Sequence, residues 1–356
     1  MGNATSEIQE LSLEKRLRYR AESAAFSSLL WLFKALPLAA SYRIAEGVTW
    51  TIYAIFRKLR VRAQTHIATC FGDSLSRSDQ KQLLRSYIRF HSWFWVDSLI
   101  GAQLITQERY RERIEANDLL SLLEREGSAG AILVGSHQGT PDLITLALGV
   151  NGYCVGAIAR TLDNPFIAKR VESLRSGIPR IEFPKAGGLR PSFAYLKKQG
   201  IVGLQIDQDA GPEGIFVPYF GKLASTHAGA GMLAALSKKP VFLTHAIRTS
   251  PRTFEYKIFA EEVEIDRGLE DTDAQVYEWT RKLTEKLEPM ARRYPEQMFF
   301  AHRRWKSQPP KRFQKPMPDN AITLIHRTSL QNASNRKIDE AHHDRENRQE
   351  GDVLHK

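Results

Sequence analysis

A histidine and an aspartate lie five residues apart in the segment Ser136-His137-Gln138-Gly139-Thr140-Pro141-Asp142. A neutral imidazole can take a proton from a hydroxyl group, and a carboxylate held against its other nitrogen strengthens it as a base. With 10 histidines and 40 acidic residues among 356, about one His-x-x-x-x-Asp/Glu match is expected by chance. Since the spacing alone is weak evidence for a catalytic pair, the positions of the two residues in the fold must support this interpretation.

The surrounding sequence indicates how this pair could meet. Residues five apart on one helix point roughly 140° away from each other, so a continuous helix would separate His137 from Asp142. The apolar residues 131–134 predict a buried strand, after which His137 would lie in a loop. Thr140 suits an N-cap and Pro141 the first helical position, which places Asp142 in a first turn that favours a carboxylate. The alternative is a core histidine followed by an ordinary capped helix.

The net charge of +11 favours an acidic partner or surface. Basic residues flank two apolar stretches near the start of the chain, and a further basic cluster spans residues 292–306. We find no nucleic-acid recognition motif, so no nucleic acid is expected, and anionic lipid headgroups explain the charge better. The two cysteines, Cys70 and Cys154, form no disulfide framework or zinc motif, which fits a reducing compartment.

The two apolar stretches cover residues 24–40 and 45–56. The first is short for a membrane span and contains Lys34 and Pro37, whereas Trp31 and Trp50 suit a membrane interface. We expect interfacial or partly inserted binding; a spanning helix and a core hairpin are the alternatives.

Strands alternate with helices after residue 131. Strands are predicted at 131–135, 153–159, 201–206, 240–247 and 254–259, and helices near 142–150, 164–176, 190–199, 227–238 and 272–292. This alternation predicts an α/β fold with a mostly parallel sheet covered by helices. We divide the chain into a polar segment 1–23, a membrane-associated helical segment 24–62, a catalytic domain 63–307 and a disordered tail 308–356.

Polar residues follow several of the predicted strands. Arg160 follows the second, and Asp207 and Gln208 follow the third. Because such residues gather in one crevice of an open α/β sheet, we expect them near His137. Arg160 could hold a phosphate or a developing oxyanion; the alternatives are a surface arginine and, for Asp207, a turn residue. Neither a metal nor a cofactor is expected, because proton transfer needs none.

The Ser136–Asp142 segment resembles the H-x-x-x-x-[DE] motif of glycerolipid and lysophospholipid acyltransferases. The sequence VGLQIDQDAGPEGIFVPYFG at 202–221, the helix after it, and YPEQ at 294–297 leading to HRRWK at 302–306 resemble the late acyltransferases of bacterial lipid A biosynthesis. The resemblance runs from about residue 26 to residue 307. Members of that family more usually carry Glu where Asp142 stands.

The resemblance implies an O-acyltransferase at the cytoplasmic face of the inner membrane. His137 would be the general base and Asp142 its partner, while Arg160, Asp207, Gln208, Arg303 and Arg304 would serve substrate binding. The donor would be acyl carrier protein or acyl-CoA, and the acceptor a lipid A precursor. A lysophospholipid or another glycolipid is the alternative acceptor. A non-catalytic lipid-binding protein and a thioester hydrolase are rival functions.

Overall fold

The computed structural model describes residues 11–104, 110–159, 162–175, 177–251, 253–265 and 271–309. The described residues fall into two compact units. The first lies within Met1–Gln205, Ser237–Glu264 and Lys286–His302, and the second within Ile206–Leu236, Ile265–Glu285 and Arg303–Lys356.

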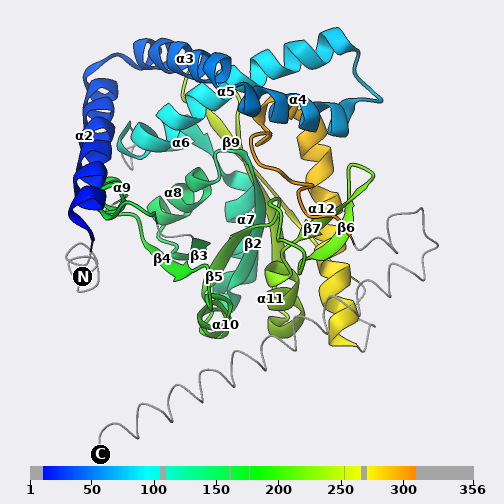
Figure 1. The fold of residues 1–356 in the computed structure, drawn as a ribbon. Helices are drawn as coiled ribbons and strands as arrows, with labels where there is room; N and C mark the ends of the chain where they lie inside the picture. The colour runs from blue at the N-terminus through cyan, green and yellow to red at the C-terminus, as the bar shows by residue number, and fades with distance from the viewer. Residues whose placement is uncertain are drawn as a thin grey trace, which may run out of the picture. The chain divides into compact units, whose positions relative to one another are not determined.

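A seven-stranded sheet forms the centre of the first unit (Figure 1). Its order is β1-β9-β8-β2-β5-β3-β4, and all neighbouring strands are parallel except β8 and β9. The mostly parallel sheet is therefore as predicted. The strands are β1 Ile114–Glu115, β2 Ala131–Gly139, β3 Val155–Ala159, β4 Arg180–Pro184, β5 Ile201–Gln205, β8 Val241–Arg248 and β9 Tyr256–Glu262.

Strand β2 lies at the topological switch point of the sheet. After β2 the chain forms β3, β4 and β5, which all lie on one side of β2 in the sheet. It then continues to β8 and β9, which lie on the other side of β2. Ligands of open α/β sheets bind beyond the carboxyl ends of strands at such a point. Residues 131–136 of β2 are all buried, as expected for a central strand covered on both faces.

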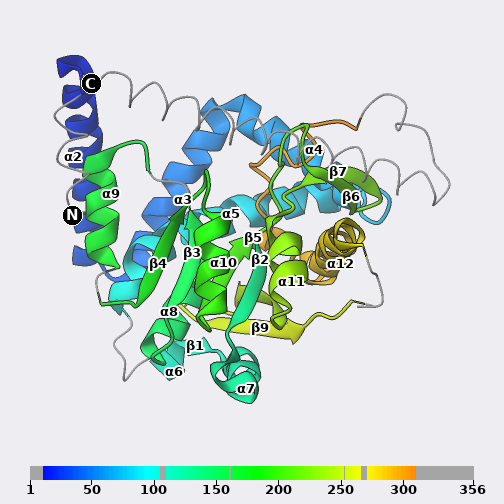
Figure 2. The same cartoon turned by 90° about the horizontal axis from the view of Figure 1, so that it is seen from below.

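Helices cover both faces of this sheet. The helices α7 Asn117–Glu126 and α8 Asp142–Val150 share an apolar core with Leu133, Phe242 and Ile258. Helix α10, Leu189–Lys197, covers β3 and β5 from the opposite face (Figure 2). Its Tyr195 packs over Gly156 of β3. The remaining short elements of this unit are α6 Tyr110–Arg113, α9 Pro165–Leu174 and the 3-10 helices η1 Gly127–Ala129 and η2 Pro295–Gln297.

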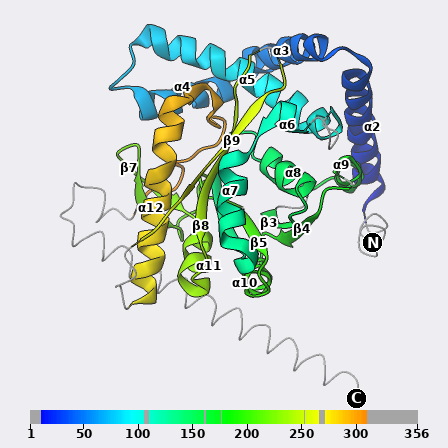
Figure 3. The same ribbon diagram turned by 180° about the vertical axis from the view of Figure 1, so that it is seen from behind.

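Four helices precede α6 and the sheet in the described part of the chain. They are α2 Leu13–Ala35, α3 Leu38–Ile55, α4 Arg57–Phe71 and α5 Arg77–Leu104. Leu30, Phe33, Tyr42 and Val96 form a second apolar core in which α2 and α3 pack on α5. Helix α2 also lies beside α9 (Figure 3). At this contact Asn164 Nδ2 donates to the Tyr19 carbonyl at 2.9 Å. No helix among the described residues is both long and apolar enough to cross a membrane.

The second unit contains a β-hairpin and a helix pair. Strands β6 Ile215–Tyr219 and β7 Lys222–Thr226 are antiparallel, and Phe220 and Gly221 join them with positive φ angles of 50° and 69°. Such angles suit a tight hairpin turn. Helix α11, Gly229–Ser237, packs closely on α12, because a Cβ at Gly231 would lie 2.6 Å from the Val276 carbonyl oxygen. Helix α12, Thr272–Arg293, continues beyond Glu285 into the first unit.

The predicted alternation of strands and helices after residue 131 is present, and three details differ. Strand β2 extends to Gly139, so His137 lies within it and not in a following loop. Helix α8 begins at Asp142 with Pro141 at its N-cap, and the Thr140 side chain contacts Tyr256 instead of capping. Strands β1, β4, β6 and β7 were not predicted. The predicted tail from residue 308 lies almost entirely outside the described residues.

Candidate active site

A bulge in β2 carries His137. Gly135 pairs with Thr244 of β8 and Gly139 pairs with Ala246, so Ser136, His137 and Gln138 stand opposite the single residue His245. Extra residues in a strand bend it and redirect side chains, which is why bulges are frequent beside active sites. Ser136 and Gln138 are buried and His137 is half-buried, and α8 begins three residues after the strand ends at Gly139.

Gly139 makes the end of this bulge possible. Its φ angle is +68°, and a Cβ at this position would lie 2.0 Å from the Ala246 carbonyl oxygen. The same carbonyl accepts a hydrogen bond from the Thr140 amide at 2.9 Å. Only glycine combines this backbone conformation with such a close approach. The turn between His137 and Asp142 is therefore held against β8.

Gln138 fastens the bulge to the end of α12. Its side-chain Nε2 donates to the carbonyls of Met290 at 3.0 Å and Tyr294 at 2.9 Å. Each of these carbonyls also accepts a hydrogen bond from a backbone amide, so the Gln138 side chain adds a second bond to both of them. The neighbouring His137 is half-buried, and its ring lies 6.0 Å from the ring of Phe299 at an interplanar angle of 30°. The imidazole thus has an aromatic neighbour and partial access to solvent.

Asp142 lies in the first turn of α8, as predicted. Its Oδ2 accepts a hydrogen bond from Arg175 Nη2 at 2.6 Å, and 56% of its side chain is exposed. Arg175 is the C-cap residue of α9, 33 positions further along the chain. The sequence offered no local signal for this ion pair, which only the packing of α9 near α8 creates. The pairing of Asp142 with His137 remains a prediction.

The other candidate residues fall in the second unit or outside the described residues. Arg160 belongs to the latter group. In the second unit, Arg304 is buried and donates from Nη1 to the Gln208 carbonyl at 3.2 Å and also to the Ser225 carbonyl. Its Nη2 lies 2.5 Å from Thr226 Oγ1.

Burial lowers the pKa of Arg304, while Tyr219 and the carboxylates of Asp207 and Asp209 oppose that shift. Asp207, Gln208 and Arg304 are therefore brought together, with Arg304 holding the Asp207–Gln208 loop to the hairpin. Arg303 is exposed. Asp209 further accepts hydrogen bonds from the amide and hydroxyl of Ser307, at 3.0 and 2.9 Å.

The family model described as bacterial lipid A biosynthesis acyltransferase matches residues 14–307, which is most of the sequence. The chain belongs to this family. It is accordingly an acyltransferase, as the resemblance predicted.

Characterised relatives support the assignment at low identity. The lipid A biosynthesis lauroyltransferase of Escherichia coli is 26% identical over 298 residues, covering 79% of this chain and 90% of the relative. The lipid A biosynthesis palmitoleoyltransferase of E. coli is 25% identical over 301 residues, with the same coverages. A lipid A biosynthesis acyltransferase of Shigella flexneri is also 25% identical over 301 residues, covering 79% of this chain and 90% of the relative.

Proposed function

We propose that this enzyme transfers a fatty acyl chain from a thioester of acyl carrier protein to a hydroxyl of a lipid A precursor. The observation that carries the proposal is His137, presented by a bulge at the switch point of the sheet in a chain of the lipid A acyltransferase family. The named activities of the relatives supply the class of acceptor.

In the proposed mechanism, His137 removes the proton from the acceptor hydroxyl as its oxygen attacks the thioester carbonyl. A carbon–oxygen bond forms and the carbon–sulfur bond breaks. The leaving thiolate then takes the proton back from the imidazolium, so the base is regenerated. Asp142 would orient the imidazole and stabilise its positive form, using the carboxylate oxygen that Arg175 does not bind.

Substrate binding is proposed for the residues beyond the ends of β3 and β5. Arg160 would bind a headgroup phosphate or the oxyanion, because a guanidinium has a fixed charge and a planar set of donors. Asp207 and Gln208 would shape the acceptor site. The buried guanidinium of Arg304 supports a role in holding their loop, whereas the exposed Arg303 is suited to meet a headgroup phosphate.

We further propose that the N-terminal helices bind the membrane surface at the cytoplasmic face of the inner membrane. Ile55 and Phe56, at the junction of α3 and α4, are 69% and 57% exposed, and Trp31 on α2 is 70% exposed. Arg57 and Lys58 follow directly and are exposed. Apolar side chains beside basic ones favour the interface of an anionic bilayer.

The decisive experiment supplies the purified protein with lauroyl and palmitoleoyl thioesters of acyl carrier protein and with a lipid A precursor. Mass spectrometry should show one added acyl chain on the precursor, and His137→Ala should abolish it. Transfer only to a lysophospholipid would favour the alternative acceptor. Free fatty acid without transfer would indicate a hydrolase, and no consumption of thioester would indicate a non-catalytic lipid-binding protein. Replacing the carrier protein with coenzyme A identifies the donor.

A further inference from the structure

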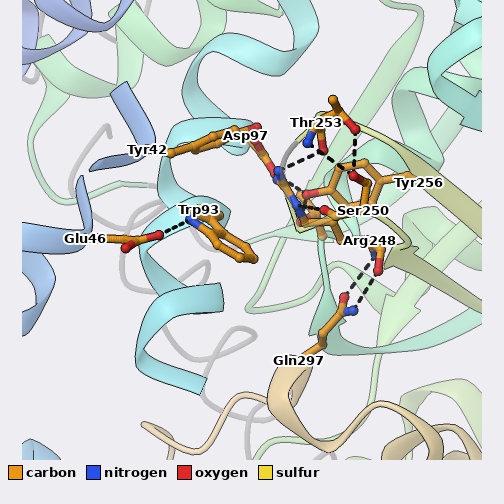
Figure 4. Close-up of polar contacts among 10 residues, drawn as sticks. Tyr42, Glu46, Trp93, Asp97, Arg248, Ser250, Thr253, Tyr256 and Gln297 are labelled. Carbon is orange, nitrogen blue, oxygen red and sulfur yellow. Dashed lines mark hydrogen bonds and ion pairs between the residues drawn. The ribbon is translucent and has the colours of Figure 1, made fainter. Parts of the chain in front are cut away.

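A buried ion pair joins an N-terminal helix to the sheet. Asp97 of α5 accepts a hydrogen bond from Arg248 Nη1 at the end of β8, and their side chains are 0% and 2% exposed (Figure 4). Tyr42 of α3 donates to Asp97 Oδ1 at 2.6 Å, and Tyr256 of β9 donates to Oδ2. Both oxygens of the carboxylate are thus engaged.

Further contacts complete the surroundings of Arg248. Its Nε and Nη2 donate to the carbonyls of Ser250 at 2.7 Å and Thr253 at 2.8 Å. The guanidinium carbon lies 4.7 Å from the ring centre of Tyr42 and 5.0 Å from that of Trp93. The charge is therefore fully coordinated in an apolar environment.

Such a pair is a poor means of gaining stability. Burial raises the pKa of Asp97 because it penalises the charged form, and the bonds from Arg248 and the two tyrosines oppose that shift. Replacing a buried ion pair with packed apolar residues is often neutral or stabilising. We therefore infer that the network has a role other than stability, and its contacts with the segment around His137 indicate which one.

The network reaches the His137 segment by two routes. Tyr256 donates its proton to Asp97, so the 3.2 Å contact between the Thr140 and Tyr256 hydroxyls is a bond donated by Thr140. On the second route, Gln297 exchanges two hydrogen bonds with the Arg248 backbone, at 3.0 and 2.8 Å. Gln297 follows the helix end whose carbonyls accept from Gln138. The two routes thus end on either side of Gly139.

We propose that Tyr256, fixed by the Asp97–Arg248 pair and acting through Thr140, is a positioning residue that holds the turn between His137 and Asp142 in its reactive geometry. The proposal rests on the proposed function only for its kinetic consequence. The turn must hold the imidazole while a proton is transferred, and small misplacements of reacting groups are costly to rate.

The chain offers a matched control for the test. Tyr256→Phe and Tyr42→Phe each remove one hydroxyl that donates to Asp97, and only Tyr256 contacts Thr140. Both variants retain their rings beside Arg248. We expect similar decreases in melting temperature, but a lower kcat only for Tyr256→Phe, by about five- to tenfold with little change in KM.

Thr140 variants test whether Tyr256 acts through its hydrogen bond with Thr140. Thr140→Val should lower kcat as much as Tyr256→Phe does, whereas Thr140→Ser should keep kcat near the wild-type value. The double variant Tyr256→Phe/Thr140→Val should have a kcat no lower than that of the less active single variant. Multiplying effects in the double variant, or equal kcat for Tyr42→Phe and Tyr256→Phe, would overturn the proposal.

Hydrogen exchange of the full-length protein provides a measurement independent of the acyl-transfer reaction. Amides in the peptide spanning residues 136–143 should exchange faster in Tyr256→Phe and Thr140→Val than in the wild type, by about threefold or more. They should be unchanged in Tyr42→Phe. If the wild type transfers no acyl chain, the proposed function fails while this exchange pattern still decides whether Tyr256 orders the turn. Equal exchange in all variants would show that it does not.

Discussion

Arg175 Nη2 donates to Asp142 Oδ2 at 2.6 Å, which ties the carboxylate of the candidate catalytic motif to the end of α9. The contact holds one oxygen of Asp142 in place. Because both oxygens lie in the plane of the carboxylate, the direction of the second oxygen is restricted as well. Both partners are substantially exposed, at 34% and 56% of their side-chain surface. An ion pair of this kind contributes at most about 1 kcal/mol to stability, so its importance is expected in orientation.

Asp142→Glu should retain more activity than Asp142→Ala, because Glu keeps the carboxylate that is proposed to orient His137 and that can pair with Arg175. We expect Asp142→Ala to lower kcat on the order of 10²-fold or more while the free energy of unfolding changes by about 1 kcal/mol or less. Steady-state kinetics and urea unfolding of both variants are the measurements. If Glu and Ala were equally inactive, Asp142 would serve the start of α8 and its ion pair with Arg175, and not act as a partner of His137.

Gly139→Ala should strongly destabilise the protein. The new Cβ would meet the Ala246 carbonyl oxygen at 2.0 Å in addition to the strain of a φ angle of +68°. We expect a loss on the order of 3 kcal/mol or more in the free energy of unfolding.

Gly152→Ala is the control for this substitution. Gly152 has a φ angle of +84° but nothing within 4 Å of a Cβ, so only the conformational strain of about 1–2 kcal/mol is expected. Urea unfolding of the two variants separates strain from collision. Equal losses would mean that the bulge of β2 relaxes without cost.

His91 should make the protein less stable in mild acid. Burial lowers the pKa of His91 from 6.5 to about 4, since the imidazole contacts Tyr53, Tyr87 and Trp95 in a largely apolar cluster. The unfolded chain therefore binds a proton between these values that the folded protein does not. Stability is greatest above about pH 6.5 and decreases as the pH falls toward 4.

From about pH 7.5 to about pH 5, this residue should contribute a loss of about 2 kcal/mol in the free energy of unfolding. His91→Gln removes the titrating group, so its stability should depend less on pH over that interval by the same amount. Urea unfolding at both pH values is the test. An unchanged pH dependence in His91→Gln would show that His91 is already accessible to protons in the folded protein.

Ile55→Ser/Phe56→Ser should weaken binding to anionic vesicles by about tenfold or more, because two exposed apolar side chains would no longer enter the interface. High salt should release part of the wild type, since charge attraction to the lipid is screened. Leu236→Ser removes a 53% exposed apolar side chain elsewhere and should not alter binding. Vesicle co-sedimentation measures all three. Unchanged binding of the double variant would place the membrane contact on other residues.

Local patterns in the sequence were sufficient for the alternation of strands and helices. Apolar runs such as 131–134 predict central strands because both faces are buried, and amphipathic segments predict the helices between them. Strand β4 escaped prediction because Arg180, Glu182 and Pro184 make it polar, as an edge strand can be. The motif spacing, together with the matches further along the chain, was enough to indicate the family.

Only the tertiary structure decided how the candidate site is held. The bulge at His137 depends on pairing with β8, a strand more than 100 positions away, so no local pattern reveals it. In the sequence Asp97 and Arg248 are ordinary charged residues that would be expected at the surface. They are buried because packing brings together residues 151 positions apart, where each offsets the other's cost of leaving water. Long-range pairing of this kind sets the geometry around His137, while the sequence by itself supplies the residues.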